Sequence, residues 1–272
     1  MENVKVLFIS QEITPYLPES EMSQIGRFLP QGIQEKGREI RTFMPRFGSI
    51  NERRNQLHEV IRLSGMNLII DDTDHPLIIK VASIQSARMQ VYFIDNEDYF
   101  TRKFVLKDNK NKYYKDNDER MIFFARGVIE TVKKLRWSPD IIHCHGWFTS
   151  LVPLYIKKSY SEDPLFMNSK LVFSAYNEGF NDTMDENFVR KIKYDGITDA
   201  VVAPLKEPTF TNLARIAFKY SDGIIMGSKE LPSEIEPLFK EVKVPVLNYQ
   251  DPEDYIDAYS VFYDRIINEP KK

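Results

Sequence analysis

The sequence predicts an α/β fold, with a doubly wound, mostly parallel, Rossmann-like sheet and a small antiparallel insertion at one edge. Short apolar runs bounded by turn residues recur along the chain, as buried parallel strands require. Between them lie segments whose apolar residues recur at helical spacing. This alternation of strands and helices favours a parallel sheet with helices on both of its faces.

The first strand and helix open this alternation. Residues 4–10 (VKVLFIS) form an apolar run typical of a buried strand, and a polar loop that contains two prolines follows. Apolar residues then recur at helical spacing over 22–33, and Gly37 marks a stop before a second strand at 39–44. We therefore predict a right-handed β-α-β unit.

The antiparallel insertion is predicted over residues 58–95. Short alternating or apolar runs at 60–63, 77–81 and 89–94 are separated there by turn residues. The following stretch, 103–115, is rich in Lys, Asn and Asp and is typical of an exposed loop.

The second half of the chain returns to the α/β pattern. A helix begins near Asp116, because Asp116 and Glu119 have the spacing of a capping box and an apolar stripe follows. A long loop at 181–208, with one short helix, is expected to cover a crevice at the strand ends. The remaining predicted elements are strands at 140–144, 171–175, 223–226 and 244–247, and helices at 148–158, 210–220, 228–239 and 251–268.

Composition excludes several classes of function. The chain has 37 Lys and Arg against 40 Asp and Glu, a net charge of -3, so it lacks the basic excess of a nucleic-acid-binding protein. No apolar run approaches the roughly 18 residues of a membrane span, and no secretion signal opens the sequence. The single cysteine, Cys144, excludes an internal disulfide framework and fits a reducing compartment. We predict a cytoplasmic protein with no nucleic-acid or membrane partner.

Ligands of open α/β sheets bind at the carboxyl ends of the strands, which here are followed by residues 10–22, 143–149 and 176–180. His143 and His145 point to one face of a strand and have spacing that suits a metal site, but hydrogen-bonded structural histidines are the favoured interpretation. Aromatic residues in these loops offer faces for sugar rings, with core packing as the alternative. The carboxylates of Glu12, Glu178 and Asp182 have the chemistry of acids or bases, but a solvated surface role is favoured.

Several segments, taken in order, resemble the N-terminal domain of bacterial glycogen synthases and plant starch synthases. These are retaining glycosyltransferases of family 5, which have the GT-B fold and use a nucleotide-diphosphate glucose. The resemblance covers nearly the whole chain. The residues that carry it are 4–10 with Glu12 and Pro15, Leu29-Pro30, 44–48 (MPRFG), 91–96 (VYFIDN), Asp116-Asn117 with Arg120, 139–145 (PDIIHCH), and 221–223 (SDG) with Glu230 and Ile235.

The resemblance implies that residues 1–250 form the acceptor-side domain, which is one Rossmann-like half of a GT-B fold. No second Rossmann-like domain follows Glu241, and in the family that domain binds the nucleotide. Residues 255–263 (YIDAYSVFY) are similar to the final helix of the family, so we expect 251–272 to pack back on the first domain.

The chain departs from the family pattern at three places near the strand ends. It has Pro18-Glu19-Ser20-Glu21 where the family has Lys-Thr-Gly-Gly, His145-Gly146-Trp147-Phe148 for His-Asp-Trp-His, and Ala175-Tyr176-Asn177 for Ile-His-Asn. We predict no catalytic residue, metal ion or cofactor. The substrate-binding residues that we predict are Glu12, Tyr16, His145, Trp147 and Asn177.

Three functional hypotheses follow. The first is a glycogen/starch-synthase-like domain that is catalytically degenerate alone and acts as a binding, scaffold or regulatory module. The second is the acceptor-side half of a split glucosyltransferase, completed by a protein partner that supplies a donor domain. The third is a domain that binds a different small molecule or protein and reuses the fold. The family activity, glucosyl transfer from ADP-glucose to an α-1,4-glucan, is not expected of this chain alone. The sequence leaves the ligand open between a glucan and another small molecule.

Overall fold

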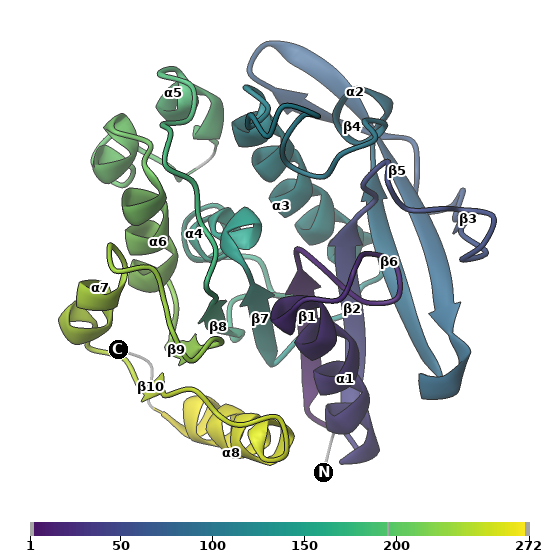
Figure 1. Cartoon of the computed structure of the whole chain (residues 1–272), viewed down its shortest axis with the longest axis vertical. Helices are drawn as coiled ribbons and strands as arrows, with labels where there is room; N and C mark the ends of the chain where they lie inside the picture. The colour runs from purple at the N-terminus through teal and green to yellow at the C-terminus, as the bar shows by residue number, and fades with distance from the viewer. Residues whose placement is uncertain (1–2, 195, 270–272) are drawn as a thin grey trace.

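The computed structural model describes residues 3–194 and 196–269. A mixed β-sheet runs through the molecule in the strand order β10-β9-β8-β7-β1-β2-β6-β5-β3, and β4 pairs with β5 beside it (Figure 1). The strands are β1 (Lys5–Ser10), β2 (Glu39–Pro45), β3 (His58–Glu59), β4 (Met66–Ile70), β5 (Thr73–Ile84), β6 (Met89–Asp95), β7 (Ile141–His145), β8 (Lys170–Ala175), β9 (Gly223–Met226) and β10 (Val246–Leu247). The α-helices are α1 (Glu21–Glu35), α2 (Glu97–Phe100), α3 (Asn117–Lys134), α4 (Leu151–Lys158), α5 (Phe188–Ile192), α6 (Phe210–Lys219), α7 (Glu236–Glu241) and α8 (Tyr255–Asn268).

The predicted fold class is confirmed. Every neighbouring pair from β10 to β6 is parallel, whereas β5 pairs antiparallel with β6 and with both β3 and β4. The sheet is therefore mostly parallel with an antiparallel edge. The edge is arranged differently from the prediction, because β6 belongs to the parallel part and residues 61–63 form a turn instead of a strand.

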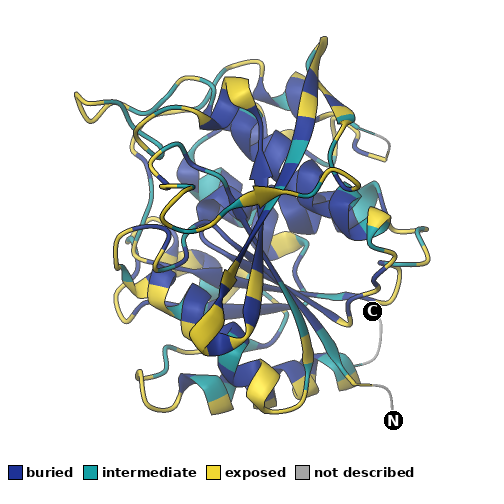
Figure 2. Cartoon of the chain, turned by 90° about the vertical axis from the view of Figure 1, so that its right-hand side faces the viewer, coloured by how far each residue is buried: buried dark blue, intermediate teal, exposed yellow. Residues whose placement is uncertain are grey.

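Helices cover both faces of the sheet. Along β1, Leu7 and Ile9 pack on the side of α3, α4 and α6, while Val6 and Phe8 pack against α1 and α8. This division follows from the alternation of side chains along a strand. Figure 2 shows buried strands in the middle of the molecule and exposed residues on the loops and outer helix surfaces.

One predicted helix start is wrong, and one predicted cap does not form although its helix begins as expected, directly after Asp116. The helix expected over 228–239 begins only at Glu236, because a longer helix would place Pro237 in its interior, where it would remove a hydrogen bond and clash with the preceding turn. The capping box at Asp116 does not form, because the Asp116 carboxylate pairs with Arg102. Phe28 falls within the apolar repeat of residues 22–33, but in α1 it is 48% exposed instead of facing the core.

Helix α8 packs onto the sheet beside α1. Only residues 248–254, seven in all, separate it from β10. Gly32 of α1 permits the close approach, since a Cβ atom there would lie 2.6 Å from Ile256 Cγ2. A buried hydrogen bond of 2.6 Å joins the Tyr263 hydroxyl of α8 to His143 Nδ1 of β7.

Tyr263→Phe is expected to lower the stability of the chain. The change leaves a buried imidazole nitrogen without its partner, a loss of about 1–3 kcal/mol, which corresponds to roughly 2–4 °C in melting temperature per kcal/mol for a domain of this size. Thermal melting followed by circular dichroism measures the effect. Tyr255→Phe on the same helix is the control, because its hydroxyl has no hydrogen-bond partner in the part of the chain that the structure describes. Equal melting temperatures for Tyr263→Phe and the parent would contradict this assignment.

Candidate functional site

The carboxyl ends of β1, β7 and β8 lie side by side at one edge of the sheet. Their register pairs Ser10 with His145 and His145 with Ser174, so the three loops that follow start at the same level. Ligands of open α/β sheets bind at this edge. The candidate site is therefore built from the loops after these three strands and from the segments that cover them.

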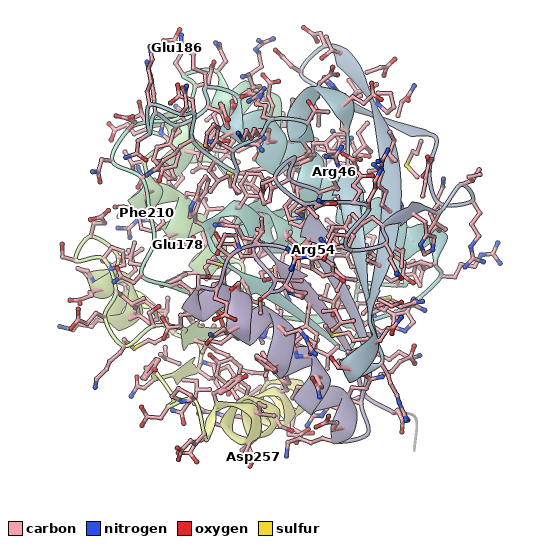
Figure 3. All side chains as sticks on the ribbon, turned by 45° about the vertical axis from the view of Figure 1, so that its right-hand side comes forward. Arg46, Arg54, Glu178, Glu186, Phe210 and Asp257 are labelled. Atoms are coloured by element: carbon pink, nitrogen blue, oxygen red, sulfur yellow. The ribbon has the colours of Figure 1, made fainter. Side chains whose placement is uncertain are left out.

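The Glu178 carboxyl group ties the three loops together. Its Oε1 atom accepts a hydrogen bond of 2.7 Å from the Trp147 backbone N–H, and its Oε2 atom accepts one of 3.0 Å from the Gln11 amide. Gln11 Oε1 in turn accepts from the Phe148 N–H at 3.1 Å. In Figure 3 Glu178 lies close to Phe210, whereas the exposed Glu186 stands at the periphery of the molecule.

Gly146 makes room for this arrangement. Its φ angle of +86° lies in the left-handed region that favours glycine, and a Cβ atom would stand 2.9 Å from Glu178 Oε1 and 2.8 Å from Met22 Sδ. A larger residue would displace the carboxyl group. The pKa of Glu178 is raised to about 8, mainly by burial and also by the nearby Glu12 carboxylate, while the hydrogen bonds from Trp147 and Gln11 lower it in part.

The N-terminus of α1 is capped by its own serines. The Ser23 N–H donates to Ser20 Oγ at 3.0 Å, and the Ser20 N–H donates to Ser23 Oγ at 2.8 Å, which is a reciprocal capping box. Two carboxylates lie close by: Glu12 accepts from the Ser20 hydroxyl at 2.8 Å, and Glu21 accepts from the Ser228 hydroxyl. The positive end of the helix dipole is therefore already faced by acceptors and negative charge.

The two strand histidines are buried and hydrogen-bonded, which confirms the favoured interpretation. His143 Nε2 contacts Ser174 Oγ at 2.7 Å, and His145 Nδ1 contacts the Tyr176 hydroxyl at 2.7 Å. Burial lowers the pKa of His145 to about 3 and that of His143 well below its usual value, so both rings are neutral. His145 Nε2 finds no hydrogen-bond partner among the described residues.

The neighbouring Cys144 is also buried, and burial raises the pKa of its thiol. Within residues 3–194 and 196–269, no group of three or more His, Cys, Asp or Glu side chains is placed to hold a metal ion. In the same ranges no helix is both long and apolar enough to cross a membrane.

Two hollows open at the strand ends, one on each side of Tyr113. The inner cleft, of about 280 Å³, lies between residues 112–117 and 180–184 and includes Trp147 in its lining. The outer cleft, of about 490 Å³, is lined by Glu12 and by residues 104–111. The predicted loops at 103–115 and 181–208 therefore form walls of the crevice.

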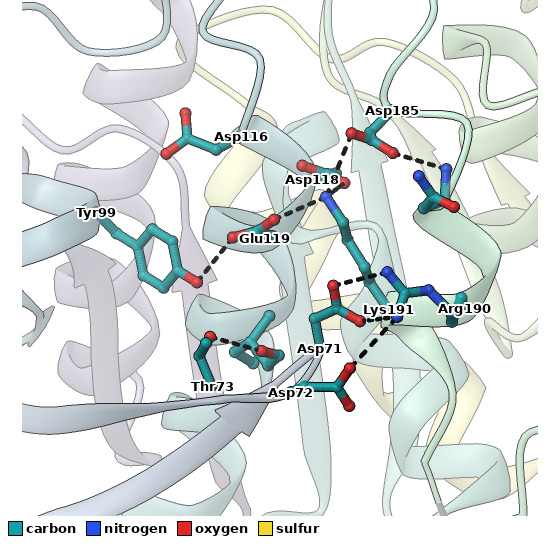
Figure 4. A network of polar contacts seen from close by, with 12 residues as sticks. Asp71, Asp72, Thr73, Tyr99, Asp116, Asp118, Glu119, Asp185, Arg190 and Lys191 are labelled. Atoms are coloured by element: carbon teal, nitrogen blue, oxygen red, sulfur yellow. Dashed lines mark hydrogen bonds and ion pairs between the residues drawn. The ribbon is translucent and has the colours of Figure 1, made fainter.

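A buried lysine holds the second wall in place (Figure 4). Lys191 Nζ of α5 lies 2.9 Å from Asp118 Oδ2 and 2.7 Å from Glu119 Oε1 at the start of α3, and 3.5 Å from Asp185 Oδ2. Burial alone would lower the pKa of Lys191, but hydrogen bonds to Glu119 and Asp118 outweigh it and raise the pKa. Burial raises the pKa of Asp118 to about 6 in spite of Lys191. These contacts join the 181–208 segment to α3.

The five predicted substrate-binding residues are not gathered at one point. Glu12 and Trp147 line the outer and the inner cleft. Asn177 is exposed, and its backbone N–H donates to Ser228 Oγ at 3.0 Å. Tyr16 is buried edge-on against the ring of Phe93, and His145 is buried as described above. The assignment of these five residues to a substrate stays a prediction.

Sequence reasoning missed the central positions of Tyr113 and Glu178. Tyr113 lies in a segment whose Lys, Asn and Asp content indicated only an exposed loop, although the adjacent aromatics Tyr113 and Tyr114 were a signal for packing. Glu178 was assigned to the solvated surface, because nothing in the sequence shows that Gly146 leaves space for its carboxyl group.

Comparison with known proteins identifies the family of this chain. The sequence profile described as "Starch synthase catalytic domain" matches residues 5–243. The chain belongs to the starch synthase catalytic domain family. The resemblance found in the sequence is therefore confirmed for most of the chain.

Glycogen synthases are among the relatives of this starch synthase family member. That of Chlorobium limicola is 40% identical over 176 residues, which are 64% of this chain and 36% of the relative. That of Pelodictyon phaeoclathratiforme is 33% identical over 234 residues, or 86% of this chain and 47% of the relative. The chain thus spans half or less of the length of these proteins.

A solved structure has the same fold. The catalytic domain of starch synthase IV from Arabidopsis thaliana, bound to ADP and acarbose, matches with a TM-score of 0.70 at 16% identity. The match covers 93% of this chain and 53% of the plant chain. At this identity the likeness concerns the fold of the starch synthase domain.

Glu178→Gln is expected to change how stability depends on pH. The folded pKa of about 8 lies above the ordinary value of 4.5, so the stability that Glu178 contributes is present below about pH 4.5 and is lost as pH rises through about 8. The variant should therefore gain in melting temperature relative to the parent between these pH values and keep a constant difference above them. Melting curves across this range test it, with the exposed Glu186→Gln as control. A Glu178→Gln difference that does not vary with pH would refute the assignment.

Proposed function

We propose that this chain is an α-glucan-binding module of the glycogen/starch synthase type that does not transfer glucose on its own. The observation that carries the proposal is the N-terminus of α1. If a glycine-rich loop preceded this helix, the free N–H groups and the dipole at its N-terminus would attract a diphosphate. Here Ser20 and Ser23 satisfy each other's N–H groups, and the carboxylates of Glu12 and Glu21 lie beside them.

A nucleotide-diphosphate glucose would meet like charges at this position. Two carboxylates near a diphosphate repel it, and the chain has no lysine between residues 11 and 24 to offset them. Loss of positioned charge stabilisation removes a large share of the rate of a group-transfer reaction. A chain without donor binding keeps only the acceptor side of the family chemistry.

The inner cleft supports the glucan side of the proposal. Tyr113, Trp147 and Phe180 bring aromatic rings to it, while Asn117 and Asp182 bring polar groups. Aromatic faces with a few convergent polar groups are suited to sugar rings, which are apolar on their faces and polar at their edges. The plant starch synthase of the same fold was captured with acarbose as well as ADP, which is consistent with a glucan as the ligand here.

The split-enzyme hypothesis ranks second. A partner chain that brought a donor domain would still place its diphosphate against the N-terminus of α1, where Glu12 and Glu21 remain. Binding, scaffolding or regulation does not require that contact. The module function is therefore favoured over an acceptor-side half-enzyme.

Calorimetry and a transfer assay on the purified chain test the proposal together. Maltoheptaose is expected to bind, whereas ADP-glucose and the β-1,4-linked control cellohexaose are expected to give no binding heat. With radiolabelled ADP-glucose and glycogen, no label should enter the polymer. Sustained chain elongation by the purified protein would overturn the proposal, and elongation only after a partner protein is added would favour the split enzyme.

A further inference from the structure

Tyr113 stands between the inner and the outer cleft and lines both. Its hydroxyl donates a hydrogen bond of 2.6 Å to the backbone carbonyl of Gly179. The bond joins the 103–115 loop to the loop after β8, across the crevice at the strand ends. The Tyr113 side chain therefore stands as a barrier where the linings of the two clefts meet.

Several contacts hold this barrier in one orientation. The Tyr113 ring meets Phe180 edge-on at 5.9 Å between centroids and Trp147 at 6.4 Å. On its other side, the Lys107 ammonium group lies 4.5 Å from the ring centroid. A backbone bridge between Lys107 and Tyr113 fixes the main chain at this point. The barrier is a packed feature of the fold and not a loose surface side chain.

The volumes of the two clefts limit how much of an oligosaccharide fits on one side of the barrier. The inner cleft, at about 280 Å³, is at the lower limit of pockets for small molecules, which measure about 300–1,000 Å³. The outer cleft, of about 490 Å³, shares the Tyr113 side chain with the inner cleft as part of its lining. A linear oligosaccharide seated beside Trp147 would run into the Tyr113–Gly179 contact as it lengthens.

We propose that Tyr113 sets the length of the α-glucan segment that this chain binds, by closing the inner cleft against the outer one. This inference rests on the proposed glucan-binding function. Sugar units within the inner cleft gain contacts with Trp147 and Phe180, whereas units beyond the barrier gain none. Affinity then rises over the shortest oligosaccharides and stops rising with further length.

Calorimetry with the series from maltose to maltoheptaose tests this inference on the full chain. The informative quantity is the ratio of the maltoheptaose to the maltotriose association constant, because any general weakening cancels in it. In the parent the ratio is expected to be close to one. In Tyr113→Ala the two clefts join, and the ratio should rise by about tenfold, equivalent to about 1.4 kcal/mol.

Two further variants make the test specific. Tyr114→Ala removes a neighbouring ring that lines only the inner cleft, so it should weaken all lengths alike and leave the ratio unchanged. Tyr113→Phe keeps the ring but loses the bond to Gly179, so it should raise the ratio in the same direction as Tyr113→Ala but less. If Tyr113→Ala does not fold, the ratio measured for Tyr113→Phe tests the role of Tyr113 on its own.

The outcomes separate this inference from the function on which it rests. A ratio that is the same in the parent and in both Tyr113 variants overturns the role of Tyr113 but leaves glucan binding in place. A parent ratio that already climbs steeply with length overturns it as well. A parent that binds no maltooligosaccharide overturns the proposed function and this inference together.

Discussion

The hydrogen bonds of the Glu178 carboxyl group organise the whole strand-end crevice. They join the loops after β1, β7 and β8, and they fix the backbone of Trp147, whose ring lines the inner cleft. The next residue, Gly179, presents the carbonyl group that accepts the Tyr113 hydroxyl. Both the cleft and its barrier therefore depend on the carboxyl group of the half-buried Glu178, for which Gly146 leaves space.

Two parts of this crevice differ in their chemistry. Around Trp147, aromatic rings and polar groups line the inner cleft. At α1, the capping box of Ser20 and Ser23 and the nearby carboxylates use the helix terminus for internal contacts. A helix N-terminus that uses two of its N–H groups in a capping box and has carboxylates beside it offers less to an incoming anion. On the opposite face, α8 is anchored to His143, which stabilises the sheet below the crevice.

The strands of the sheet were predicted well, because the apolar runs that indicate them are local features of the sequence. The apolar runs at 4–10 and 171–175 match β1 and β8, and the residues 223–226 match β9. One error arose because a distant partner decides the outcome. Asp116 was expected to cap α3, but Arg102 takes its carboxylate. The late start of α7 has a local cause, because Pro237 suits only the first turn of a helix.

The site was harder to predict than the fold, because it depends on contacts between loops. Nothing near Glu178 in the sequence shows that Gln11 and Trp147 will donate to it from other strands. Lys191 likewise meets Asp118 only because α5 folds over α3. Tyr16 and His145 have residue types that suit sugar binding, yet both are buried by their neighbours.

A crystal structure of the chain grown with both maltoheptaose and ADP tests the central claim most directly, because the two halves of the crevice are then compared in one experiment. We predict glucose units beside Trp147 in the inner cleft and no nucleotide at the N-terminus of α1. A diphosphate bound to the backbone N–H groups of α1 next to Glu21 would contradict it.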